Sequence, residues 1–193
     1  MATLTKGNQQ ARMSNESDQH YEARLAIGTL KHAKGTHDQI RHAMATLYKA
    51  SNATKEEDAD IKETLQMIGI LDEKEFPNDR DIRDQITVSK MNVARNKEAH
   101  SHTLDYMARQ ILFNGGQKDK DTRNIILEYI IHNKNTSNST IVDIIKNYKD
   151  SRIAEEGEEE LNKRKAQHNE LDKFLRKYGP PGVGAIMAFF GFF

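Results

Sequence analysis

The chain has 193 residues, of which 30% are charged and 36% are hydrophobic, and it contains no Cys. Its 29 Lys and Arg balance 29 Asp and Glu, which disfavours a general nucleic-acid binder because such proteins carry a basic excess or a basic face. The length suits one domain with a hydrophobic core, and the absence of Cys excludes a disulfide framework, a thiolate zinc site and a cysteine nucleophile.

Residues 1–16 are polar with isolated apolar side chains, so we expect a flexible N-terminus that is not a secretory signal peptide. Hydrophobic periodicity then predicts three helices, at residues 17–34, 37–51 and 54–71. Thr36 can cap the second helix, and Thr54 with Glu57 forms a capping-box pattern at the third. Because short connections favour antiparallel packing, residues 17–71 are predicted to form a helical hairpin plus one helix.

A break is predicted at residues 72–79, where Pro77 lies among charged side chains, and this is the clearest internal boundary in the sequence. Beyond it we expect a long helix that starts at residue 79 or 81 and ends at Phe113, before a pair of glycines. His100 lies on the apolar stripe of this helix, so we expect it to be a hydrogen-bonded histidine of the core.

The most apolar helix is expected at residues 121–132, where four isoleucines cover more than one face, and it should form the centre of the core. A last helix is predicted from Ser139 and can continue to Tyr178, with a solvated glutamate-rich middle and no sustained heptad pattern. No internal repeat of about 20–50 residues is apparent. The sequence therefore predicts an all-α fold, a bundle of about six helices with one or two long helices, in which residues 79–178 form the long-helix part.

The motifs predict neither a metal site nor an enzyme. His32, His37 and His42 recur every five residues, whereas metal-binding histidine pairs on a helix lie three or four residues apart. The carboxylates occur in runs that are typical of solvated helix faces, and no P-loop, dinucleotide-binding or serine-hydrolase motif is present. We therefore expect a non-enzymatic protein that needs no cofactor.

A different class of function, a helix-turn-helix regulator that binds nucleic acid, is the alternative at residues 121–165. Three predicted helices there match the outline of that motif, although a plain three-helix packing unit would match it equally well. The helix that would lie in the major groove, at residues 152–160, contains five glutamates. Those glutamates would repel phosphate, so the sequence favours a protein that does not bind nucleic acid.

Residues 179–193 differ from everything before them, since a Pro-Gly hinge leads into an apolar segment with four phenylalanines among its last five residues. The candidate binding residues in this apolar tail are Val183, Ile186, Met187, Phe189, Phe190, Phe192 and Phe193. Together they carry on the order of 10–20 kcal/mol of gross transfer free energy. The tail is shorter than the about 20 apolar residues of a membrane span. Three fates are open: packing on the chain's own helices, insertion into a membrane surface, or docking on a partner.

Lys173, Arg176 and Lys177 precede the apolar tail and suit an anionic membrane surface. Alternatively, cations of the last helix balance its glutamates in i, i+4 pairs, Glu159 with Lys163 and Glu160 with Arg164. We expect a structural or interaction protein, of a kind common in virus and phage virions and their accessory proteins, that binds a membrane surface or a protein partner through the tail. The expected location is the cytoplasm or the inside of a virion, with peripheral membrane attachment and homo-oligomers left open.

Overall fold

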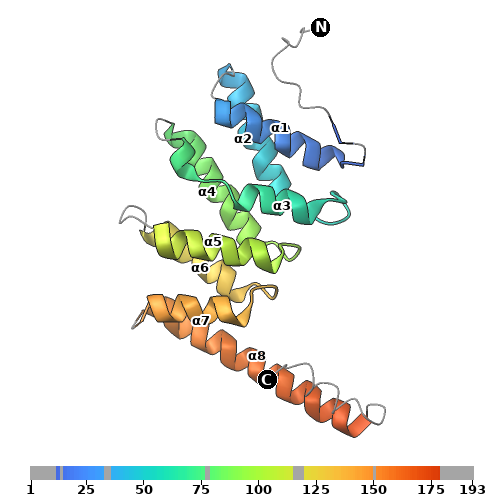
Figure 1. The fold of residues 1–193 in the computed structure, drawn as a ribbon, viewed down its shortest axis with the longest axis vertical. Coiled ribbons are helices and arrows are strands. Elements are labelled where there is room, and N and C mark those ends of the chain that lie inside the picture. The colour runs from blue at the N-terminus through green and yellow to red at the C-terminus, as the bar shows by residue number, and fades with distance from the viewer. Residues whose placement is uncertain are drawn as a thin grey trace. The chain divides into compact units, whose positions relative to one another are not determined.

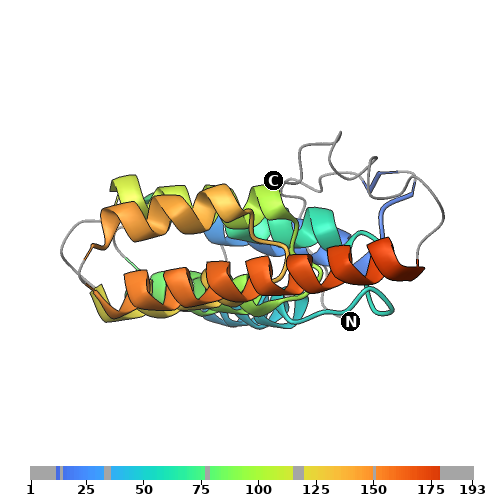
Figure 2. The ribbon, with the colours of Figure 1, turned by 90° about the horizontal axis from the view of Figure 1, so that it is seen from below.

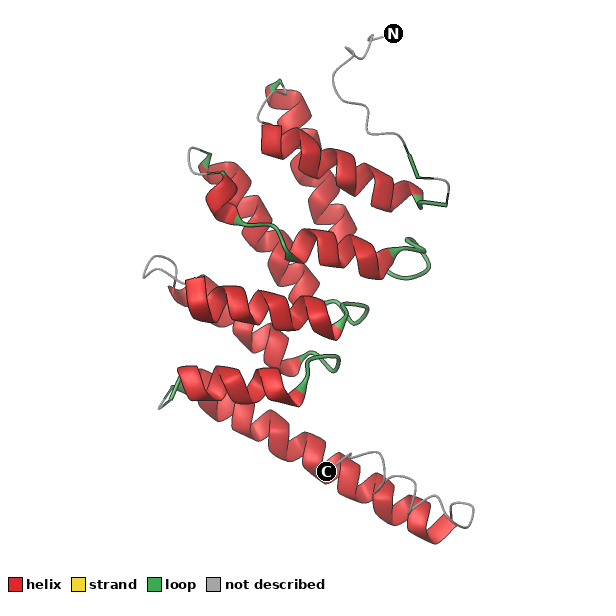
Figure 3. Ribbon diagram, viewed as in Figure 1, coloured by secondary structure: helices red, strands yellow, loops and turns green. Residues whose placement is uncertain are grey.

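The computed structural model describes residues 12, 13, 15–32, 36–76, 79–114, 120–149 and 151–178. Within these ranges the regular structure is entirely helical, with no strand, which confirms the predicted all-α class (Figure 3). The helices are α1 (Asp18–His32), α2 (His37–Ser51), α3 (Ile61–Gly69), the 3-10 turn η1 (Glu73–Glu75), α4 (Arg80–Arg95), α5 (Ser101–Asn114), α6 (Lys120–His132), α7 (Asn138–Asn147) and α8 (Arg152–Tyr178).

The chain divides into two compact units, residues 1–140 and 141–193. The domain organisation expected from the sequence, with its boundary at residues 72–79, stays a prediction. Helices on the two sides of residues 72–79 do contact each other, since α2 packs on α4 and α1 packs on α3.

The first unit is built from helical hairpins that stack in two layers (Figure 1). Helices α1, α3 and α5 contact one another in sequence along one layer, and α2, α4 and α6 do so along the other. Each helix also packs on its hairpin partner, α1 on α2, α3 on α4 and α5 on α6. The hairpins start about 40 residues apart, which is the spacing of two-helix repeat proteins although the sequence shows no obvious repeat.

The ends of the first two helices follow from local sequence signals. Ser17 caps α1, because its Oγ accepts the amide of His20 at 3.1 Å. Thr36 caps α2 in a capping box, in which its hydroxyl accepts the Gln39 amide at 3.4 Å and the Gln39 side chain accepts the Thr36 amide at 2.8 Å. The helix predicted at residues 37–51 is confirmed over that range.

The helix expected from residue 54 begins only at Ile61. The side chain of Glu57 does accept the Thr54 amide at 2.8 Å, but the chain continues in turns rather than in a helix. The reason lies in Asp58, which is completely buried and points into a polar cluster instead of onto a solvated helix face.

The single long helix expected over residues 79–113 is wrong, because α4 ends at Arg95 and α5 starts at Ser101. Asn96 adopts an extended conformation, with φ −69° and ψ 124°, and its side chain donates to the carbonyl oxygens of Ser51 and Ala53. His100 is therefore not a core residue. It is exposed in front of α5, where its ring stacks on that of His102 with 5.1 Å between centroids.

Helix α6 contributes four residues from one of its faces to the core of the first unit, as the sequence predicted for this segment. They are Ile126, Leu127, Ile130 and Ile131, all buried. Ile125, in contrast, is 38% exposed, so the apolar side chains of this helix do cover more than the buried face.

The second unit contains most of α7 and all of α8 (Figure 2). Because α7 ends at Asn147 and α8 starts at Arg152, the continuous helix expected from residue 139 to 178 is not formed. The two helices approach closely at Gly157, where an added Cβ would lie 2.8 Å from Cγ1 of Ile145. Beyond Glu160, none of the side chains that the structure describes in α8 is buried, and Leu171 is 49% exposed.

Candidate functional site

The residues that the sequence selects for binding fall mostly outside the described part of the chain. All seven apolar residues of the tail lie outside it, and so do the side chains of Arg176 and Lys177. Lys173 is described, and it is exposed near the end of α8. The role of the apolar tail therefore stays a prediction.

The charges of α8 separate into an acidic first part and a basic second part. Glu160 joins them, because it accepts from Arg164 at 2.9 Å and lies 3.7 Å from Nζ of Lys163. This confirms the expected pair of Glu160 with Arg164, whereas Lys163 contacts Glu160 rather than Glu159. Lys165 and Lys173 are exposed, and neither forms an ion pair with a residue that the structure describes.

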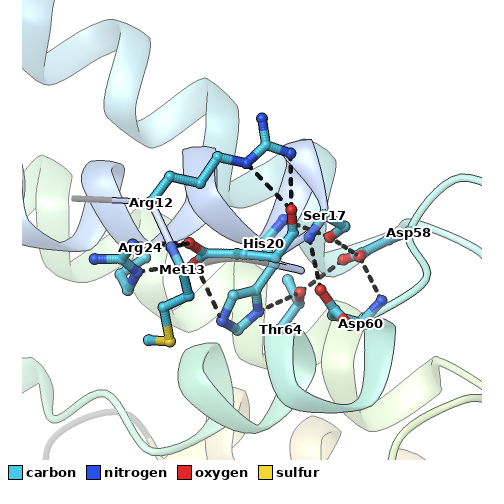
Figure 4. Close-up of polar contacts among 9 residues, drawn as sticks. Arg12, Met13, Ser17, His20, Arg24, Asp58, Asp60 and Thr64 are labelled. Atoms are coloured by element: carbon cyan, nitrogen blue, oxygen red, sulfur yellow. Dashed lines mark hydrogen bonds and ion pairs between the residues drawn. The ribbon is translucent and has the colours of Figure 1, made fainter. Parts of the chain in front are cut away.

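The densest set of polar contacts lies where the chain enters α1, and Figure 4 shows it. This entry cluster consists of Arg12, Met13, Glu16, Ser17, His20, Arg24, Asp58, Asp60 and Thr64. It joins residues that precede α1 to the α2–α3 connection and to the first turn of α3, more than 40 residues away in sequence.

Glu16 is the buried anion of the entry cluster, with a side chain that is 3% exposed. Both of its carboxylate oxygens accept from the Arg24 guanidinium, at 2.8 and 2.9 Å, and Oε2 also accepts the Met13 amide at 3.1 Å. The hydrogen bond with Arg24, helped by that amide and by nearby positive charge, lowers the pKa of Glu16 from 4.5 to about 2, against the opposing effect of burial. The same pair raises the pKa of Arg24.

Asp58 is the second buried carboxylate, and it accepts three hydrogen bonds. The hydroxyl groups of Ser17 and Thr64 donate to it at 2.5 and 2.6 Å, and the amide of Asp60 donates at 2.9 Å. Thr64 also lies 3.0 Å from Nδ1 of His20, which extends the network back to α1. A buried carboxylate with this many donors holds the elements that supply them in one arrangement.

The two fully buried members of the entry cluster, Thr64 and Asp58, connect segments of the chain and are closed to solvent in this arrangement. These residues could not be identified from the sequence, since each stands in an ordinary polar stretch and the contacts join segments that are distant in the chain. Local sequence patterns predict burial only for apolar side chains, and the side chains of the entry cluster are mostly polar.

A second polar arrangement, here called the asparagine ladder, joins the loops that follow α2, α4 and α6; its members are Asn96, Asn133 and Asn135. Asn133 donates to the carbonyl oxygens of Ala94 and Asn96, at 2.8 and 2.9 Å. Asn135 donates to the next free carbonyl oxygens of the same loop, those of Lys97 and Ala99. The ladder thereby supplies donors to carbonyl groups at and just beyond the ends of helices.

A shallow hollow of 410 Å³ lies at the start of α1 beside the end of α2 and the following loop. Its lining residues are Gln19, Tyr48, Lys49, Asn52, Ala53 and Glu57. Among the described residues, no group of three or more potential ligands could hold a metal ion, and no helix is long and apolar enough to cross a membrane.

Comparison of the chain with protein-family models, with curated proteins and with solved structures finds no match in any of the three.

Proposed function

We propose that this chain is a non-enzymatic interaction protein, in which a stack of helical hairpins carries an apolar C-terminal tail to a membrane surface. The observation that carries the proposal is the solvent exposure of Lys165 and Lys173 on α8. Both are exposed and form no ion pair with the described residues, and both lie on the stretch of α8 that leads to the tail.

Two weak attractions would act together at such a surface. Each Lys or Arg near an anionic bilayer contributes about 1 kcal/mol, and each large apolar side chain of the tail contributes roughly 1.5–3 kcal/mol when fully buried. Either attraction alone gives only marginal membrane binding, whereas a basic stretch next to an apolar segment gives a stable attachment.

The described helices favour an interaction role over an enzymatic one. Their buried charged and amide side chains, such as Glu16, Asp58 and Asn133, are occupied by contacts between segments of the chain. An active site would instead bring such groups together at a pocket, with some of their hydrogen-bonding capacity left for a substrate.

The helix-turn-helix alternative is supported less well. Glu155, Glu158 and Glu159 are exposed at the start of α8, where a recognition helix would approach the DNA backbone. Arg152, the cation that could oppose them, contacts Glu156 at 2.8 Å. A partner protein with an apolar groove is the closer competitor, because it would use the same tail residues.

Flotation with lipid vesicles tests the proposal. The full chain should float with vesicles that contain phosphatidylserine and much less with pure phosphatidylcholine. A truncated chain ending at residue 178 should stay unbound while keeping its helical circular dichroism and melting temperature. Reversing the charges of Lys165 and Lys173 to Glu should weaken flotation, whereas Lys62→Glu, at an exposed site on α3, should not.

Two outcomes would overturn the membrane proposal. If the truncated chain unfolds, the tail is part of the core and not a binding segment. If the full chain ignores anionic vesicles but a purified partner binds it only when the tail is present, the tail docks in a protein groove.

A further inference from the structure

His20 occupies a position in the entry cluster where both of its ring nitrogens face defined partners. It is the third residue of α1, and its side chain is 14% exposed. Nδ1 lies 3.0 Å from the Thr64 hydroxyl oxygen, and Nε2 lies 3.6 Å from Oε1 of Glu16 (Figure 4). The ring therefore connects the segment before α1 with the first turn of α3.

The proton on Nδ1 is fixed by the contacts of Thr64. Its hydroxyl group has one proton, which it donates to the Asp58 carboxylate at 2.6 Å. Toward His20 the Thr64 oxygen can then only accept, so Nδ1 must be the donor in that contact.

The other ring nitrogen faces an anion. Glu16 is ionised over the whole physiological pH range, because its pKa is lowered to about 2, so it can only accept. A neutral ring with its proton on Nδ1 would turn the Nε2 lone pair toward that carboxylate. A doubly protonated ring instead offers a donor to both neighbours.

Charged side chains surround the ring. The carboxylates are those of Glu16 and Asp18 at the start of α1 and of Asp58 and Asp60 in the α2–α3 connection. Among the described cations, Arg24 is bound to Glu16, while Arg12 binds the Glu16 carbonyl group and Asp18.

We propose that His20 is a proton-operated latch that fastens Glu16, Ser17 and the start of α1 to α3. When the ring is doubly protonated, it bridges the Glu16 carboxylate and the Thr64–Asp58 pair. A ring without the Nε2 proton cannot donate to Glu16, so Glu16 and Ser17 are then held less firmly. The latch lies in the first unit and does not depend on the apolar tail.

Hydrogen exchange of two amides reports on the latch, since Met13 donates to Glu16 and Ser17 donates to Asp60. In the full chain, their protection factors, corrected for intrinsic exchange, should fall about fivefold from about pH 5 to about pH 8, where histidines change charge. In His20→Gln the protection should not change over this interval. His42→Gln, at an exposed site on α2, should keep the full pH response.

Equal protection at both pH values in the unmodified chain would overturn the proposal, and so would an unchanged response in His20→Gln. If His20→Gln does not fold, ring ¹⁵N shifts of the unmodified chain decide the question. The neutral ring should keep its proton on Nδ1. A neutral ring with the proton on Nε2 would contradict the donor assignment on which the latch rests.

Discussion

Asn133 donates a hydrogen bond from Nδ2 to the main-chain carbonyl oxygen of Asn96, at 2.9 Å, and so ties the end of α6 to the end of α4. Asn96 makes the same kind of contact one hairpin earlier, with the carbonyl oxygens of Ser51 and Ala53 at 3.3 and 2.9 Å. Each of these asparagines stands directly after the last residue of its helix. One residue type at an equivalent place therefore joins successive hairpins of the first unit.

Replacing Asn133 should destabilise the fold. Asn133→Ala removes the two hydrogen bonds that Nδ2 donates and the one that Oδ1 accepts from the Asn135 amide. It leaves the carbonyl group of Ala94, inside a buried contact, without that partner, so we expect a loss of about 1–3 kcal/mol. Urea denaturation followed by circular dichroism measures the change. Asn169→Ala, at an exposed site on α8, is the control and should change stability by less than about 0.5 kcal/mol. Equal stability of the two variants would show that the asparagine ladder does not stabilise the fold.

Two glycines in helices of the first unit should respond to Ala in opposite ways. A Cβ on Gly69 would lie 2.7 Å from Cγ2 of Thr103 and 3.1 Å from Sδ of Met107, so Gly69→Ala forces α3 and α5 apart and should cost about 1–3 kcal/mol. A Cβ on Gly28 has no heavy atom within 4 Å, so Gly28→Ala should stabilise α1 by about 0.5–1 kcal/mol. Thermal melts of both variants compare the effects, and a stabilising Gly69→Ala would be inconsistent with the close α3–α5 contact.

Replacement by Val should also affect stability differently at two buried threonines, which lie at the starts of α3 and α5. The hydroxyl group of Thr103 is buried and has no hydrogen-bond partner among the described residues, so Thr103→Val should be neutral or stabilise the fold by about 1 kcal/mol. Thr64→Val should instead destabilise it by about 1–3 kcal/mol, because it removes a donor from the buried Asp58 and an acceptor from His20. Chemical denaturation of the pair measures the difference. Similar losses in both variants would mean that Thr103 has a partner after all.

Most helices of this chain could be predicted, because apolar periodicity and capping residues are local features of the sequence. The range of α2 follows from its apolar stripe and its Thr36 cap, and the apolar segment around Ile130 does lie in the core. The end of α4 could not be predicted in this way. The residues from Asn96 to His100 continue a helical pattern in sequence, and what ends the helix is a contact with a loop more than 40 residues earlier.

The repeated architecture was missed because it is carried by few residues. Asn96 and Lys97 recur as Asn133 and Lys134, and at the same spacing Thr103 and Leu104 recur as Thr140 and Ile141. Between these positions, residues 98–102 and 135–139 share no identical residue at this spacing, so the repeat is hard to recognise. The entry cluster is even less visible in sequence, because its two buried carboxylates lie far apart in the chain, Glu16 before α1 and Asp58 in the α2–α3 connection.

Glu16 should give the chain a specific sensitivity to acid. Its pKa is lowered from 4.5 to about 2 by the hydrogen bond with Arg24, so its ionised form adds stability above about pH 4.5 that is lost as the pH falls toward 2. Glu16→Gln cannot ionise, and it should lower stability at neutral pH while flattening the fall between about pH 5 and pH 2. Urea denaturation over this pH interval measures both effects. Glu22→Gln, at an exposed site on α1, should follow the unmodified chain. Because other carboxylates titrate in all three proteins, the informative quantity is the difference in slope. An identical slope in Glu16→Gln would show that the buried pair with Arg24 is not what makes the fold sensitive to acid.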